Sequence, residues 1–88
     1  MSRHEKLLMR VLSGRSDANI EFEELDSLLQ RLGFSVRVRG SHHVFVLPGT
    51  ETMLNLQRDG HLAKSYQVRQ VRTAILAHGL VPDVEENT

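Results

Sequence analysis

The 88-residue chain contains no cysteine, so neither disulfide bonds nor thiolate metal ligands can hold its fold together. This absence is compatible with a reducing cytoplasm. Long apolar runs are also missing, and the charged start, Arg3-His4-Glu5-Lys6, does not resemble a signal peptide. No cluster of Asp, Glu and His has the spacing of a metal site. We therefore expect a soluble, cytoplasmic protein with no membrane segment, metal or cofactor.

The formal net charge of the whole chain is zero, because eleven Lys and Arg residues balance eleven Asp and Glu residues. The charges are unevenly distributed, however. Residues 34–78 contain six basic residues and only two acids, Glu51 and Asp59, whereas acids are in excess before and after this stretch. The middle of the chain thus has a net charge of about +4, as a nucleic-acid-binding surface would require.

Apolar residues at helical spacing predict helices over residues 4–12 and from about 20 to 32. Alternating residues then predict strands over 34–39, 42–47 and 52–57, with a loop at 58–61. A last helix is predicted from residue 64 or 65 to the cap Gly79, with Leu76 in its buried stripe and Arg69 and Arg72 pointing more outward. The predicted core residues are Phe22, Leu25, Leu29, Val36, Phe45, Leu54, Val71 and Ile75.

One apolar face per element predicts an α+β fold, in which helices pack on one face of a three-stranded antiparallel sheet. We expect a single domain over residues 1–80. Residues 1–18 form an additional N-terminal helix and loop, and residues 19–80 form the core. Residues 81–88 are expected to be a flexible acidic tail.

The dipeptide Gly40-Ser41 is suited to a two-residue hairpin turn, with glycine in the left-handed conformation. Such a turn pairs Arg39 with His42 and Val38 with His43, and paired residues share a face of the sheet. The helix-free face then carries Arg37, Arg39, His42, Val44 and Val46. The core face carries Phe34, Val36, Val38, His43, Phe45 and Leu47. Another loop length would change this pairing.

A histidine beside arginines has the chemistry needed to cleave RNA without a metal. Imidazole can take the 2′-hydroxyl proton near neutral pH, so that the oxygen attacks the adjacent phosphate. Arginines can hold that phosphate and stabilise its extra charge in the transition state. The candidate phosphate ligands are Arg37, Arg39, Ser41, Lys64, Arg69 and Arg72. A simpler reading is that His42 is an ordinary surface residue and that Ser41 only closes the turn.

Three segments together resemble the HicA family of toxins from bacterial toxin–antitoxin pairs. They are Leu-Leu-Gln-Arg-Leu-Gly-Phe at residues 28–34, Gly-Ser-His-His-Val-Phe at 40–45 and Lys-Ser-Tyr-Gln-Val-Arg-Gln-Val-Arg at 64–72. The likeness covers roughly residues 20–80 in the expected order.

This resemblance implies a fold like that of double-stranded-RNA-binding domains and metal-independent cleavage of mRNA. It also implies a HicB-type antitoxin as the inhibitory partner. The family's catalytic histidine falls within Gly-Ser-His-His, and the pairing argument favours His42, with His43 as the alternative.

The chain departs from the family in three respects. Many members carry a Pro-x-His element near the third strand, where this chain has Leu-Asn-Leu-Gln at residues 54–57; His61 is a nearby stand-in. The first helix is additional, and the chain is neutral rather than basic. Two other functions remain open. One is RNA or DNA binding without catalysis, and the other is a protein-interaction domain that uses the extra helix with Val44 and Val46.

Overall fold

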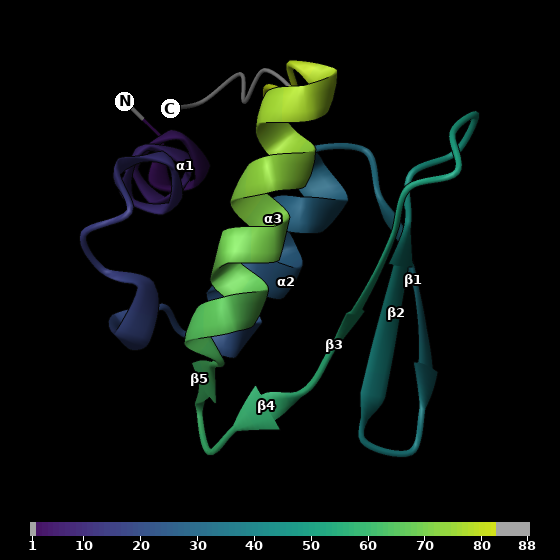
Figure 1. Cartoon of the computed structure of the whole chain (residues 1–88), viewed down its shortest axis with the longest axis horizontal. Coiled ribbons are helices and arrows are strands. Elements are labelled where there is room, and N and C mark those ends of the chain that lie inside the picture. Colours follow the sequence, from purple (N-terminus) through teal and green to yellow (C-terminus); the bar gives the residue numbers. More distant parts are fainter. Residues whose placement is uncertain (1, 83–88) are drawn as a thin grey trace.

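The computed structural model describes residues 2–82, and its main elements follow the predicted order (Figure 1). The helices are α1 (Arg3–Ser13), a short 3₁₀ helix η1 (Asp17–Asn19), α2 (Phe22–Arg31) and α3 (Ser65–His78). The strands are β1 (Ser35–Arg39), β2 (His42–Val46), β3 (Met53–Leu56), β4 (Arg58–Asp59) and β5 (Leu62–Ala63). Of the predicted acidic tail, only residues 81 and 82 fall within the described part of the chain.

Local sequence explains where the helices begin and end. The Ser2 side chain caps α1 by accepting from the Glu5 amide, while the Glu5 carboxylate accepts from the Ser2 amide. The hydrogen bond from the Ser2 backbone, followed by that from its side chain, lowers the pKa of Glu5. After α2, Gly33 has a φ of 108°, and the amide of Phe34 donates to the Leu29 carbonyl. This motif ends the helix and directs the chain into β1.

Strands β1, β2 and β3 form an antiparallel sheet in that order. Arg39 pairs with His42, so Gly40 and Ser41 alone form the turn. Gly40 has a φ of 58°, whereas Ser41, like every other non-glycine residue in the described chain, does not have a positive φ. A type II′ turn requires a positive φ at its first central residue only. The predicted hairpin register is therefore confirmed.

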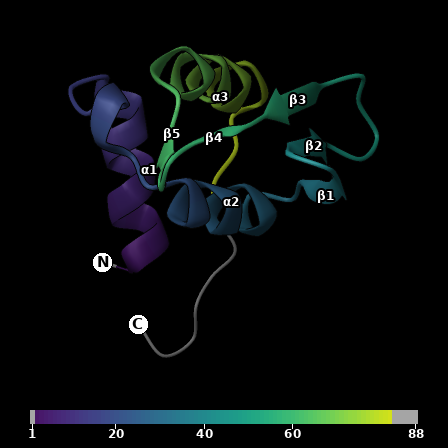
Figure 2. The ribbon, with the colours of Figure 1, turned by 90° about the horizontal axis from the view of Figure 1, so that it is seen from below.

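All three α-helices lie on one side of this sheet, and no helix of residues 2–82 covers its other side (Figure 2). Helix α1 packs on α2 and α3, and its Leu7 and Val11 are buried in the common core. Every predicted core residue is buried except Val36, which is half-buried and packs against the core. The predicted α+β fold is thus confirmed. None of the helices in residues 2–82 is long and apolar enough to span a membrane.

Two predictions about the strands are wrong. Val38, expected on the core side, is 57% exposed, because it lies at the turn end of the edge strand β1, beyond the cover of the helices. Residues 58–61 are not a simple loop, since Asp59 pairs with Leu62 and β4 and β5 form a second short hairpin. Its turn again begins with a left-handed glycine, Gly60, at a φ of 64°.

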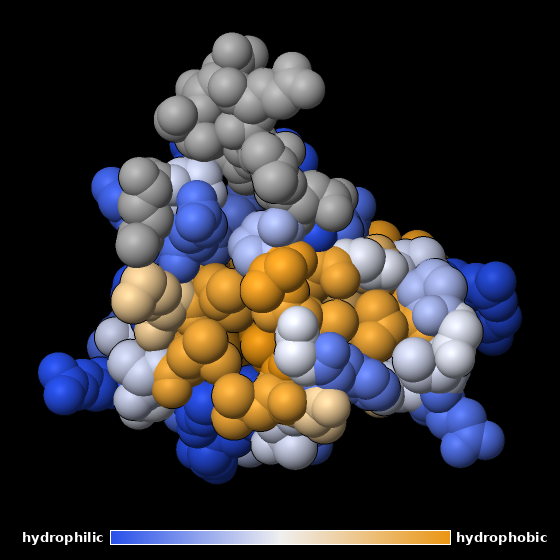
Figure 3. Space-filling model, turned by 90° about the horizontal axis from the view of Figure 1, so that it is seen from above, coloured by the Kyte–Doolittle hydropathy of each residue, from blue (hydrophilic) through white to orange (hydrophobic). Residues whose placement is uncertain are grey.

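Apolar side chains gather on the surface at the end of the molecule where α3 terminates (Figure 3). Leu76, which was expected to be buried, is 66% exposed there, and Val81 is 73% exposed. Consecutive helical residues are rotated by about 100°, so burial of Ile75 turns Leu76 away from the core. The predicted burial of Leu76 is therefore wrong.

Arg72 joins α3 to the N-terminal segment. Its Nη1 and Nη2 lie 3.0 and 3.1 Å from the two carboxylate oxygens of Asp17, and Nη1 also donates to the Val11 carbonyl at 2.9 Å. The side chains of Arg72 and Asp17 are only 20% and 15% exposed. The prediction that Arg72 points outward is thus wrong, because its guanidinium is already paired with a carboxylate in the fold.

We predict that Asp17→Ala lowers the Tm by on the order of 5 °C, because Arg72 stays half-buried but loses its charged acceptor. Thermal unfolding followed by circular dichroism measures this change. Glu51→Ala removes an exposed acid and should leave the Tm nearly unchanged. Equal Tm values for the two variants would contradict the anchoring role of the ion pair.

Candidate active site on the open face of the sheet

Nine side chains form the face of the sheet that carries no helix, which we call the open face. Paired residues of antiparallel strands share a face, and Gln57, which directly follows β3, continues the pattern. From the β1–β2 turn outward, the rows are Arg39–His42–Gln57, Arg37–Val44–Asn55 and Ser35–Val46–Met53. Successive rows are about 7 Å apart.

Both ring nitrogens of His42 face side-chain amides that belong to β3 or to the residue directly after it. Nδ1 lies 3.0 Å from Oδ1 of Asn55, and Nε2 lies 3.4 Å from Nε2 of Gln57. An amide oxygen can only accept, so Nδ1 of His42 carries the proton in the first contact. In the neutral ring Nε2 then keeps its lone pair, and the Gln57 amide donates to it. Asn55 thereby makes Nε2 the basic nitrogen of His42.

The contact between His42 and Gln57 is near the upper limit of hydrogen-bond length, and His42 itself is exposed. A hydroxyl group of a ligand can replace such a weak contact at small cost. The basic nitrogen of His42 is therefore accessible for proton transfer.

Gln57 links the β1–β2 turn to the helix layer. Its side chain donates to Oγ of Ser41 at 3.1 Å, while its backbone amide donates to Oε1 of Gln67 at 3.3 Å. Gln67 lies in the first turn of α3 and is only 2% exposed. A buried polar group without a partner is costly, so this contact fixes the end of β3 relative to α3. The turn that precedes His42 is held through the same residue.

The predicted cations are divided between two parts of the molecule. Arg37 and Arg39 are exposed on β1, beside the strand of His42. Lys64 immediately precedes α3, at the same end of the molecule as the β1–β2 turn (Figure 1), and Arg69 is exposed farther along that helix. Only Arg37 and Arg39 therefore share the open face with His42.

His43, the alternative catalytic histidine, is on the core side of the sheet. Its ring packs edge-on against Phe22, with the centroids 4.8 Å apart, and the residue is half-buried. Its Nδ1 is buried and has no hydrogen-bond partner among residues 2–82. The side chain of His43 therefore faces the helix layer rather than the open face, so the geometry favours His42.

Arg58 lies over the ring of Phe22, with 4.9 Å between the guanidinium carbon and the ring centroid, and forms an ion pair with Glu23. The hydrogen bond from Arg58, and then its charge, lowers the pKa of Glu23.

His61 lies in the β4–β5 turn, where its Nδ1 is 3.6 Å from Oε1 of Glu21. Within residues 2–82, His42 hydrogen-bonds to the side chains of Asn55 and Gln57, whereas His61 faces Glu21.

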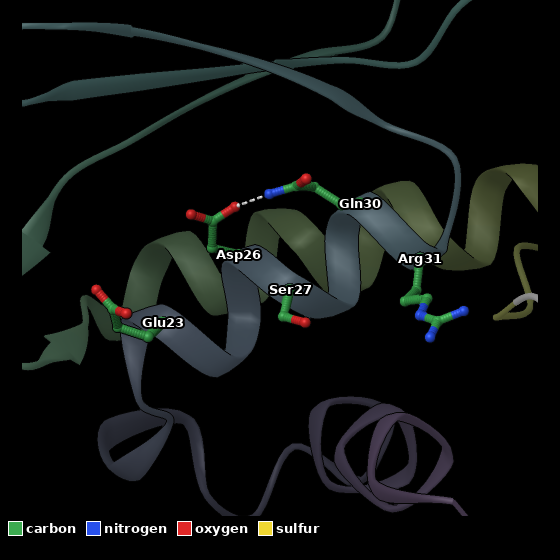
Figure 4. A pocket seen from close by; sticks show the side chains of 5 residues that line it. All are labelled: Glu23, Asp26, Ser27, Gln30 and Arg31. Carbon is green, nitrogen blue, oxygen red and sulfur yellow. Dashed lines mark hydrogen bonds between the residues drawn. The ribbon is translucent and has the colours of Figure 1, made fainter. Parts of the chain in front are cut away.

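A pocket of about 340 Å³ lies along α2, which packs on the covered side of the sheet (Figure 4). Asp26 accepts a hydrogen bond from Gln30 in its wall, and Glu23 adds a second carboxylate. Arg31 also lines this pocket, which does not include His42 or the arginines of β1. Among residues 2–82, no three His, Asp or Glu side chains gather as a metal site would require.

Sequence patterns alone do not single out Asn55, Gln57 or Gln67. Part of the signal is present, because residues 53, 55 and 57 alternate with the buried Leu54 and Leu56 and must share the outer face. The position of Asn55 and Gln57 beside His42 depends on the register of β3 against β2, which no short turn motif determines. The partners of His42 could therefore be listed as candidates but not assigned.

We predict that the neutral form of His42 is protonated at Nδ1, and that Asn55→Ala shifts it toward the form protonated at Nε2. Nδ1–H loses its acceptor in this variant, so nothing in the site holds that tautomer. The ¹⁵N chemical shifts of the ring nitrogens distinguish the two forms. Asn19→Ala, the same substitution at an exposed position in η1, is the control. An unchanged tautomer in Asn55→Ala would refute the assigned role of Asn55.

A second prediction concerns Glu23. Arg58→Gln should raise the pKa of the Glu23 carboxyl toward its ordinary value, because the favourable hydrogen bond and charge are lost. Carboxyl ¹³C shifts measured between pH 2 and 7 report this change. The pKa of Glu5, which is lowered by Ser2 rather than by Arg58, should not move.

Comparisons with models of known protein families, with curated proteins and with solved structures found no match to this chain. Its function therefore has to be inferred from the open face. That face combines a histidine of defined tautomer with two exposed arginines and a group of apolar side chains.

Proposed function

We propose that the protein is an endoribonuclease that cleaves mRNA without a metal ion, with His42 as the general base. The observation that carries this proposal is the hydrogen bond from Nδ1 of His42 to Asn55. It leaves the other ring nitrogen basic on an exposed surface beside Arg39. A neutral imidazole in this tautomer has a lone pair on Nε2 that can take a proton from a bound hydroxyl group.

In the proposed reaction, Nε2 of His42 displaces the Gln57 amide and takes the proton of a ribose 2′-hydroxyl. The 2′ oxygen forms a bond to the adjacent phosphorus, the bond from phosphorus to the 5′ oxygen breaks, and water protonates the departing oxygen. The hydroxide that remains takes the proton from His42, which restores the neutral ring. The products are a 2′,3′-cyclic phosphate and a 5′-hydroxyl. The step needs neither an oxidant nor a reductant.

Charge stabilisation comes from β1. Arg39 is directly opposite His42 in the hairpin, and Arg37 is in the next row. A pentacoordinate phosphorane carries more negative charge than the phosphodiester, so nearby guanidinium groups stabilise it preferentially. In this proposal Ser41, which accepts a hydrogen bond from Gln57 at the turn, orients the phosphate. Lys64 and Arg69 act at most as distant phosphate contacts, since they belong to the helix layer.

The same activity is implied by the resemblance to HicA-type toxins, and we include membership of that family in the proposal. A HicB-type antitoxin would then be the partner that blocks the open face, and cytoplasmic mRNA would be the substrate. Where many members carry Pro-x-His, this chain has Asn55 and Gln57, which both contact His42. In this proposal two amides orient the single catalytic histidine.

Cleavage of a labelled RNA in the presence of EDTA tests the proposal. We expect His42→Ala to lower the rate by about 10²- to 10⁴-fold, because the general base is lost. Asn55→Ala should lose less, because the ring remains but its tautomer is no longer held. Circular dichroism establishes that each variant is folded.

Two controls identify the chemistry. A 2′-deoxy nucleotide at the cleavage position should block the reaction, because the attacking oxygen is absent. His43→Ala should retain cleavage, since His43 is on the core side. Loss of cleavage in His43→Ala alone would assign the base to that residue instead. Wild-type protein that leaves RNA intact would overturn the ribonuclease proposal.

A further inference from the structure

An apolar surface lies beside His42 on the open face. It consists of Val44, which is half-buried, Val46, which is 38% exposed, and Met53, which is 66% exposed. These three residues and Arg37 line a depression of about 350 Å³. Val44 lies two residues from His42 on the same strand, so the depression begins about 7 Å from the catalytic row.

The positively charged side chains of the open face lie along one edge of this apolar surface. Arg37 and Arg39 are on β1 and are separated by about 7 Å along the strand. The opposite edge, on β3, is uncharged, with Met53, Asn55 and then Gln57. A nucleotide is divided in the same way, because its phosphate is anionic whereas the faces of its base are flat and weakly polar.

We infer that the open face binds an extended single strand of RNA, with phosphates along Arg37 and Arg39 and one base on Val44, Val46 and Met53. The inference rests on the proposed function, because cleavage places a ribose at His42. A neighbouring nucleotide of the same strand then reaches the depression. Its phosphate meets the cations of β1, and its base replaces water on the apolar surface.

A single strand fits this surface better than a duplex does. In double-stranded RNA the bases are stacked and paired, so a protein reaches mainly backbone and groove edges. The apolar side chains would then face phosphate and ribose. Contact with the flat face of a base does not depend strongly on which base it is. The expected substrate class is therefore single-stranded RNA with little base preference at this position.

The test uses His42→Ala protein, so that RNA stays intact during a binding measurement. Fluorescence anisotropy at one ionic strength gives the Kd for a single-stranded oligonucleotide, for its duplex, and for the same strand with internal abasic positions. Adding Met53→Ser should weaken binding of the intact strand about tenfold. It should leave duplex and abasic strands nearly unaffected. The matched control is Leu76→Ser, which removes an equally exposed apolar side chain from α3.

The outcomes separate this inference from the ribonuclease proposal. Equal affinity for intact and abasic strands, or equal weakening of both by Met53→Ser, overturns the base-binding surface even if the wild type cleaves RNA. Binding of the intact strand that depends on Met53, together with a wild type that does not cleave, supports the surface and rejects the enzyme. The absence of measurable single-strand binding overturns the inference, whatever the cleavage assay shows.

Discussion

A turn of two residues determines which side chains of β1 and β2 lie on the open face with His42. Gly40 and Ser41 leave Arg39 opposite His42, and the left-handed conformation of Gly40 makes this short connection possible. Side chains alternate between the faces of a strand, so a shift of one residue would move His42 to the core face and His43 to the open face. The whole chemical proposal therefore depends on this register.

The two adjacent histidines illustrate how environment rather than residue type decides chemistry. His42 is exposed, and amides on both of its nitrogens define its tautomer. His43 packs against Phe22, and its Nδ1 is buried without a partner among residues 2–82. His43 therefore packs against the helix layer. Identical side chains, one residue apart, acquire different roles because the pleat of the strand separates them.

Amide side chains connect the site to the rest of the fold. Gln57 contacts the turn and His42 with its side chain, and the buried Gln67 with its backbone. Helix α3 is itself joined to α1 and η1 through Arg72 and Asp17. Disturbing the N-terminal segment can thus affect how firmly α3 supports the end of β3. Helix α1 is thus joined to the rest of the fold, although the sequence analysis expected it to be additional to the core over residues 19–80.

The sequence by itself determined the features that depend on neighbouring residues. Helical periodicity, the cap at Gly79 and the Gly40–Ser41 turn predicted the main elements, most of the core and the face that carries His42, Arg37 and Arg39. These features follow from backbone conformation and hydrogen bonds within a few residues, so a short segment contains their cause.

Tertiary structure alone decided which distant side chains meet. It paired Asp17 with Arg72, which removed a predicted phosphate ligand from the candidate site. It also brought Asn55 to His42 and left Val38 and Leu76 exposed. Such outcomes depend on how strands register across a longer loop and how helices cover a sheet. The physical reason is that these contacts are settled by packing of the whole core, which no local pattern of residues specifies.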